Sequence, residues 1–123
     1  MGGADWLIAH PIAHRGLHDA SAGVIENTAA AFSAAVAAGY GIETDLQISA
    51  DGEAMVHHDD ALGRLTEGSG ALAEMSAVQI QAVRYKAGGG RMLTLGELCD
   101  LVAGRVTLLL ELKSHFDGNL RLV

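Results

Sequence analysis

The first residues that could do chemistry are His14, Arg15 and Gly16, which follow the short apolar run of residues 11–13. The imidazole of His14 can exchange a proton near neutral pH, and the guanidinium of Arg15 can hold a phosphate with two N–H groups. Gly16 permits the chain to turn away from a strand. This group indicates proton transfer beside a bound anion, although Arg15 could instead pair with an acidic residue at another strand end.

Three carboxylates also lie at or near strand ends. Glu43 and Asp45 are two residues apart on a predicted strand, so their side chains share a face and repel each other unless a cation or protons neutralise them. Glu111 ends an apolar strand, where an unpaired charge is costly. Three oxygen ligands without a thiolate favour Mg²⁺ or Ca²⁺ over Zn²⁺. The alternatives are a solvated edge strand for the first pair and a structural ion pair between Glu111 and Lys113.

A second histidine, His58, ends the strand that is predicted after the turn signal Asp51 and Gly52. Cleavage of a phosphodiester needs one group that takes a proton from the attacking oxygen and another that protonates the leaving oxygen. A lone histidine is more often structural, but two at strand ends beside three carboxylates favour acid–base roles for His14 and His58. His57 points to the other face of the strand and is predicted to pack in the interior.

Caps, turns and apolar runs predict the elements that position these residues. Residues 29–38 form the clearest helix, which Asn27 or Thr28 caps and Gly39 ends. Glu26 either belongs to this cap or orients a neighbouring arginine or histidine. The other predicted elements are strands at residues 12–14, 41–48, 54–58 and 106–111, a loop at 59–70, and two helices that begin with capping boxes at Ser76 and Thr94, the second ending at Gly104.

Apolar strands separated by helices predict an α/β fold with a mainly parallel sheet. In such a sheet, functional sites lie at the carboxyl ends of the strands. All four chemical clusters sit at such strand ends, so we expect them to meet around one divalent metal and one phosphodiester. The continuous apolar run at residues 106–111 is typical of a strand that is buried on both faces.

Length and composition narrow the class of protein. The chain has 123 residues, which suits a single domain spanning residues 1–123. Its formal net charge of −7 argues against nucleic acid or an anionic membrane as the main partner. We expect neither a signal peptide nor a membrane-spanning helix, because no basic flank precedes a long apolar segment. The single Cys99 excludes an internal disulfide and fits a reducing, cytoplasmic setting.

Taken together, these motifs resemble those of the glycerophosphodiester phosphodiesterases. The similarity runs in order over nearly the whole chain, and the combination is far more specific than any one motif. The matching stretches are residues 14–16, Glu26 to Thr28 with Ala31 and Phe32, residues 43–47, Asp51 with Gly52, residues 56–60 with Leu62, Arg64 to Thr66, and residues 111–113.

The resemblance implies a TIM-barrel fold and hydrolysis of glycerophosphodiesters to glycerol 3-phosphate and an alcohol. It also implies a role for each residue of the site. Glu43, Asp45 and Glu111 would bind the divalent metal, His14 and His58 would form the acid–base pair, Arg15 and Lys113 would contact the phosphate, and Glu26 would support the same site.

The chain departs from the family in its length. A TIM barrel takes about 250 residues, so 123 residues with four predicted strands would supply only about the first half. A half-barrel leaves sheet edges and apolar faces uncovered, so we expect it to aggregate, pack loosely or associate with another half. The alternatives to the hydrolase are therefore a catalytically incomplete half-barrel that only associates with a partner chain, or a related phospholipase that acts on intact lipid.

Overall fold

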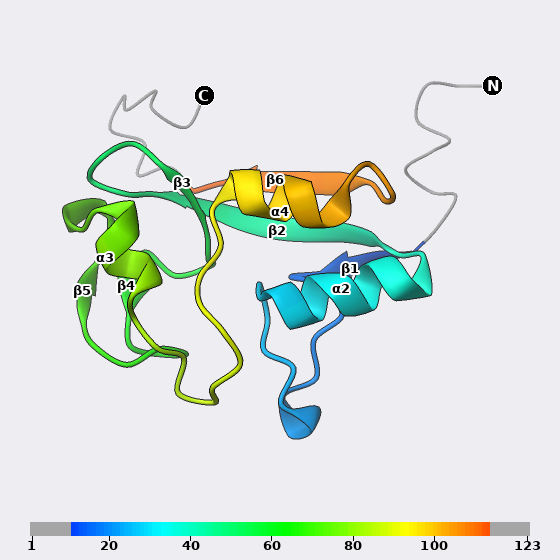
Figure 1. Ribbon diagram of the computed structural model, residues 1–123, viewed down its shortest axis with the longest axis horizontal. Helices are drawn as coiled ribbons and strands as arrows, with labels where there is room; N and C mark the ends of the chain where they lie inside the picture. The colour runs from blue at the N-terminus through cyan, green and yellow to red at the C-terminus, as the bar shows by residue number, and fades with distance from the viewer. Residues whose placement is uncertain (1–10, 114–123) are drawn as a thin grey trace.

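A parallel three-stranded ladder forms the centre of the computed structural model, which describes residues 11–113 (Figure 1). Strand β2 (Gly41–Ile48) lies between β1 (Ile12–His14) and β6 (Leu108–Leu112), and both neighbours run parallel to it. The register pairs His14 with Glu43 and Asp45 with Glu111. The parallel arrangement therefore brings three of the predicted site-bearing strands together.

Helix α2 (Ala29–Ala38) connects β1 to β2 and has the predicted bounds. The side chain of Thr28 caps it by accepting a hydrogen bond from a backbone N–H of the first turn, and Gly39 ends it in the left-handed region at φ 73°. Phe32 and Ala35 are fully buried in the hydrophobic core between α2 and the sheet. Helix α2 therefore anchors β1 and β2 as one βαβ-type unit.

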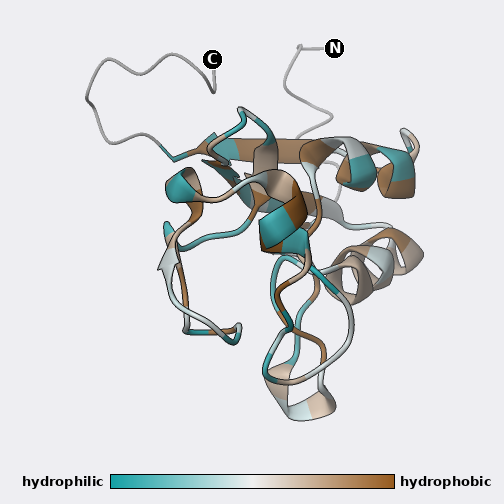
Figure 2. Cartoon of the chain, turned by 60° about the vertical axis from the view of Figure 1, so that its left-hand side comes forward, coloured by the Kyte–Doolittle hydropathy of each residue, from teal (hydrophilic) through white to brown (hydrophobic). Residues whose placement is uncertain are grey.

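Helix α4 (Leu95–Val102) lies beside α2, and both pack against the sheet in one hydrophobic core (Figure 1). Its capping box at Thr94 is formed as predicted, but the residue in the left-handed region directly after the helix is Ala103, not Gly104. Figure 2 shows brown and teal residues alternating along α4, whereas α2 is almost uniformly pale brown. Alternation of this kind is typical of a helix with one buried face.

The strand before His58 is shorter than predicted and antiparallel. Strand β3 (Ala54–Val56) folds back on β2 after a turn, with Leu46 opposite Val56. His58 therefore reaches the site from the returning arm of a hairpin and not from a fourth parallel strand. The physical reason is the short turn at residues 49–53, because parallel strands need a much longer crossover connection.

A second hydrophobic cluster, which includes Met55 of β3 with Leu62 and Leu72, lies beside the hairpin. The predicted loop at residues 59–70 contains β4 (Ala61–Leu62), which pairs with β5 (Gly70–Ala71), so the expectation of a loop was wrong in part. Helix α3 (Ala77–Gln81) follows with the predicted capping box. The remaining short elements are the 3₁₀ turns η1 (Ala20–Ala22) and η2 (Leu72–Glu74).

Strand β6 forms as predicted but begins two residues later and is not buried on both faces. Leu109, Leu110 and Leu112 are 46%, 40% and 43% exposed. Among the described residues only β2 pairs with β6, so the other edge of β6 and part of its surface stay uncovered. In the part of the chain that the structure describes, no helix combines the length and apolar character needed to cross a membrane.

Candidate active site

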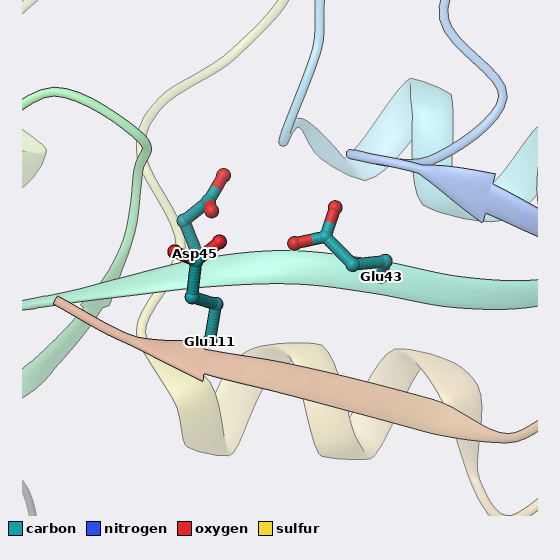
Figure 3. Close-up of side chains that lie close together, drawn as sticks. All are labelled: Glu43, Asp45 and Glu111. Carbon is teal, nitrogen blue, oxygen red and sulfur yellow. The ribbon is translucent and has the colours of Figure 1, made fainter.

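Three carboxylates meet where β2 and β6 run side by side. Glu43 and Asp45 project from β2 to the same side, and Glu111 projects from β6 opposite Asp45 (Figure 3). One oxygen of each lies within 4.8 Å of the others. Asp45 is 1% exposed and Glu43 is half-buried, whereas Glu111 is exposed. The sequence therefore identified three acidic residues that the fold does bring together.

The electrostatics of this carboxylate cluster fit a divalent cation. Burial and the adjacent charge of Asp45 raise the pKa of Glu43 above its ordinary value. Glu43 Oε2 is buried, and no donor among the described residues hydrogen-bonds to it. A hard cation would neutralise the repulsion and bind this oxygen, and an all-oxygen donor set suits Mg²⁺ or Ca²⁺.

Two cations border the carboxylate cluster, and both form ion pairs with carboxylates. Arg15 Nε lies 3.5 Å from Asp45 Oδ2, and Lys113 Nζ lies 3.7 Å from Asp45 Oδ1. Lys113 Nζ also donates to Glu111 Oε1 at 3.0 Å, and this hydrogen bond lowers the pKa of Glu111. The ion pairs that the sequence left open as alternatives are therefore formed, and they place both cations beside the cluster.

Asn27 is a site residue that the sequence suggested only as a helix cap. Its Nδ2 donates to Asp45 Oδ2 at 3.2 Å, and its Oδ1 accepts from the Thr44 hydroxyl at 2.7 Å. All three side chains are buried, and the Asn27 backbone has a positive φ of 55°. Asparagine tolerates this conformation better than most residues. A polar residue directly before the capping Thr28 was the signal that could have indicated this role.

The two predicted acid–base histidines come from separate segments of the chain. His14, on β1, faces the cluster, with Nε2 3.4 Å from Glu43 Oε2. His58 follows β3 and lines an open cavity of about 590 Å³ that Lys113 also lines. His57 is 1% exposed and burial lowers its pKa, which agrees with the predicted packing role.

A chain of ion pairs runs from Arg15 to His58. Glu26 receives a hydrogen bond from Arg15 at 2.5 Å and another from Arg64 at 2.6 Å. Arg64 in turn binds Asp59, and Asp59 contacts His58. Of the two alternatives for Glu26, the structure therefore favours the orientation of an arginine. The roles of Arg64 and Asp59 were missed, although both residues lie in stretches that match the family.

Comparison with known proteins agrees with this geometry. The sequence model of the Glycerophosphoryl diester phosphodiesterase family matches residues 14–118. A glycerophosphodiester phosphodiesterase from Caldanaerobacter subterraneus is 37% identical over 111 residues, which are 84% of this chain and 44% of that protein. Glycerophosphodiester phosphodiesterase 1 from Rattus norvegicus is 32% identical over 117 residues, 86% of this chain and 34% of that protein.

Solved structures show the same relationship. A phosphodiesterase from Oleispira antarctica, in complex with the product sn-glycerol-3-phosphate, superimposes with a TM-score of 0.74 at 29% identity, over 85% of this chain and 44% of that one. A glycerophosphodiester phosphodiesterase from Agrobacterium tumefaciens gives a TM-score of 0.74 at 30% identity, over 85% and 47%.

These structural relatives are TIM-barrel enzymes, so β1, β2 and β6 are strands of a partial TIM barrel. The chain spans less than half the length of the curated relatives described above. Three barrel strands are seen among the described residues instead of the four predicted, because β3 belongs to a hairpin. By sequence and by fold, the chain belongs to the glycerophosphoryl diester phosphodiesterase family.

Proposed function

We propose that this chain carries the metal-binding and acid–base residues of an enzyme that hydrolyses glycerophosphodiesters to glycerol 3-phosphate and an alcohol. The observation that carries the proposal is the approach of Glu43, Asp45 and Glu111 to within 4.8 Å, with His14 beside them. Family membership and a relative solved with sn-glycerol-3-phosphate support the substrate class. A bound Mg²⁺ or Ca²⁺ would supply charge neutralisation for a phosphate oxygen.

The histidines would perform the proton transfers. One of His14 and His58 accepts the proton of the attacking oxygen, which belongs either to water or to the glycerol hydroxyl of the substrate. That oxygen forms a new P–O bond while the P–O bond to the alcohol breaks, and the other histidine protonates the departing alcohol. When the attacking oxygen is the glycerol hydroxyl, this step gives a cyclic phosphate, and water then adds to phosphorus and breaks the ring P–O bond to give glycerol 3-phosphate. Arg15 and Lys113 would hold the remaining phosphate oxygens by charge-assisted hydrogen bonds.

Alanine variants of the two histidines test the acid–base roles. We expect H14A and H58A each to lower the release of glycerol 3-phosphate by at least about 100-fold, the usual scale of acid–base catalysis, with divalent-metal affinity largely retained. H18A is the matched control, because His18 is exposed and lies outside the site. Turnover at the wild-type rate in H14A or H58A would refute the assignment.

Amide variants of the carboxylates test the metal site separately. D45N and E111Q each remove one charged ligand while keeping nearly the same shape. We expect both to weaken Mg²⁺ and Ca²⁺ binding in calorimetric titrations and to lower turnover, with turnover partly restored at high metal concentration. E97Q is the control, because Glu97 caps α4 away from the cluster. Unchanged metal affinity in D45N would refute the site.

Self-association of a partial barrel domain is the second candidate function. The observation that favours it is the uncovered β6, whose Leu109, Leu110 and Leu112 are all more than a third exposed. Sedimentation of the purified 123-residue chain, combined with an assay for glycerol 3-phosphate, separates the two candidates. A monodisperse but inactive dimer would favour association, and a dissociation of that dimer by L110K would localise the interface to β6.

The same proposal includes the class of substrate and the cellular location of the protein. The formal charge of −7 supports a small-molecule substrate over nucleic acid. The single Cys99 supports a reducing, cytoplasmic location. Fractionation of cells that express a tagged chain tests this location, and recovery in a secreted fraction would contradict it.

A further inference from the structure

His58 is held through one ring nitrogen by the residue that follows it. Its Nδ1 lies 2.8 Å from Asp59 Oδ1. The backbone of His58 is fixed as well, because Gln47 Nε2 donates to its carbonyl oxygen at 2.8 Å. Both the position of the residue and the orientation of the ring are therefore determined by contacts, while the ring still borders the cavity.

Asp59 is itself clamped by an arginine fork. Arg64 Nε donates to Asp59 Oδ2 at 2.7 Å, and Arg64 Nη2 donates to Asp59 Oδ1 at 3.2 Å. The third nitrogen, Nη1, donates to Glu26 Oε1 at 2.6 Å, and Glu26 is 8% exposed. A planar guanidinium that satisfies two carboxylates at once fixes the carboxylate of Asp59 in one orientation.

The contact between Asp59 and His58 bears on which ring nitrogen of His58 carries a proton. Asp59 is ionised at neutral pH, as an aspartate with an ordinary pKa already is, and the hydrogen bond from Arg64 lowers its pKa further, to about 2. An ionised carboxylate can only accept hydrogen bonds. A hydrogen bond between His58 and Asp59 then requires a proton on Nδ1. Neutral His58 therefore has its lone pair on Nε2, the opposite of the tautomer that imidazole side chains favour in water.

We propose that Asp59 and Arg64 are positioning residues that hold His58 as its Nδ1–H tautomer and so make Nε2 the atom that exchanges protons with the substrate. The consequence for turnover rests on the proposed function, in which His58 is an acid–base residue. The tautomer itself does not, because it follows from contacts of the folded chain. The same chain of contacts reaches Arg15 through Glu26, so it links Arg15 to His58.

Nuclear magnetic resonance of the ¹⁵N-labelled 123-residue chain tests the tautomer. At a pH where His58 is neutral, we expect a protonated-type resonance for Nδ1 and an unprotonated-type resonance for Nε2. In D59N, Arg64 would claim the amide oxygen and leave the NH₂ group facing Nδ1, so the two resonances should exchange types. R91Q is the matched control, because Arg91 pairs with Glu97 outside the site.

Turnover of the same variants tests the consequence. We expect D59N to lower kcat by about 100-fold or more, the scale of a lost acid–base contribution, with little change in KM. R64Q should also lower kcat, and R64K should restore only part of it, because lysine keeps the charge but loses the fork. R64Q leaves Asp59 in place, so it tests the clamp even if D59N folds poorly.

The outcomes separate this inference from the proposed function. A protonated Nε2 in wild-type His58, or a tautomer that D59N leaves unchanged, would overturn the positioning role of Asp59, and wild-type kcat in R64Q would overturn that of Arg64. Wild-type kcat in D59N together with an inactive H58A would also overturn the role of Asp59. If D59N changes the tautomer while H58A keeps full turnover, the positioning of the ring stands and the catalytic role of His58 fails.

Discussion

Replacing Asn27 with alanine should remove two buried hydrogen bonds next to the carboxylate cluster. The Thr44 hydroxyl loses its acceptor and Asp45 loses one donor, and both side chains are at most 1% exposed. An unsatisfied buried group costs about 1–2 kcal/mol. Alanine at a φ of 55° costs about 1 kcal/mol more than asparagine or glycine. N27A should therefore lower the free energy of unfolding by about 3–5 kcal/mol.

A glycine at the same position separates the two contributions. N27G loses the same hydrogen bonds but accepts the positive φ, so it should be less destabilised than N27A by about 1 kcal/mol. Urea unfolding of the 123-residue chain, followed by circular dichroism, measures both values. Free energies of unfolding within about 0.5 kcal/mol of wild type, the usual effect of a surface substitution, would refute the contacts of Asn27.

The same variants should affect the predicted metal site. Asn27 restrains one oxygen of Asp45, which is the most buried carboxylate of the cluster. Loss of a group that orients a metal ligand typically lowers metal affinity by about 10-fold or more. We expect N27G, the milder variant, to bind Mg²⁺ or Ca²⁺ more weakly in calorimetric titrations. Unchanged affinity in folded N27G would show that Asn27 supports the fold but not the ligand.

Three further predictions concern other parts of the chain. G16A should lower the free energy of unfolding by about 2–4 kcal/mol, because an added Cβ at a φ of 80° would lie within 3.0 Å of α2. G39A has a similar φ but open space around the added Cβ, so it should cost only about 1 kcal/mol. Equal losses of the two variants in urea unfolding would contradict this. Burial lowers the pKa of His57, so the wild type should lose free energy of unfolding as the pH falls below the usual histidine pKa. H57L removes this group and should flatten the dependence of the free energy of unfolding on pH between about pH 7 and 5. An unchanged dependence would contradict the prediction. R64Q should raise the pKa of Asp59 from about 2 towards 3.8 in a carboxyl titration by nuclear magnetic resonance. The stability that Asp59 provides in the wild type above pH 3.8, which is lost as the pH falls towards 2, should then be largely absent from R64Q at every pH. A midpoint still near 2 would contradict the clamp.

Sequence signals predicted the secondary-structure elements well where the stabilising interactions lie within a few residues of one another. Helix α2 has the predicted bounds because a capping Thr28, an alanine-rich interior and Gly39 all act within a few residues. The capping boxes at Ser76 and Thr94 are formed for the same reason. Glu43 and Asp45 were correctly placed on one face because the side chains of a strand alternate with a period of two.

Contacts between distant segments could not be predicted in the same way. The antiparallel direction of β3 is an exception, because the short turn before it already favoured a hairpin. The ion pair between Glu26 and Arg64 joins residues 38 positions apart, which no local period encodes. The exposure of β6 depends on what covers its free edge, and an apolar run gives no information about that.

The ion pairs of Asp45 connect metal binding to phosphate binding in the proposed function. In the structure Arg15 and Lys113 are both engaged by Asp45, so they provide part of the neutralisation that the carboxylates require. A divalent cation on the same carboxylates would take over that neutralisation and weaken the hold on both side chains. Their charged groups would then be available to phosphate. Metal should therefore increase phosphate affinity, and by thermodynamic reciprocity phosphate should increase metal affinity by the same factor.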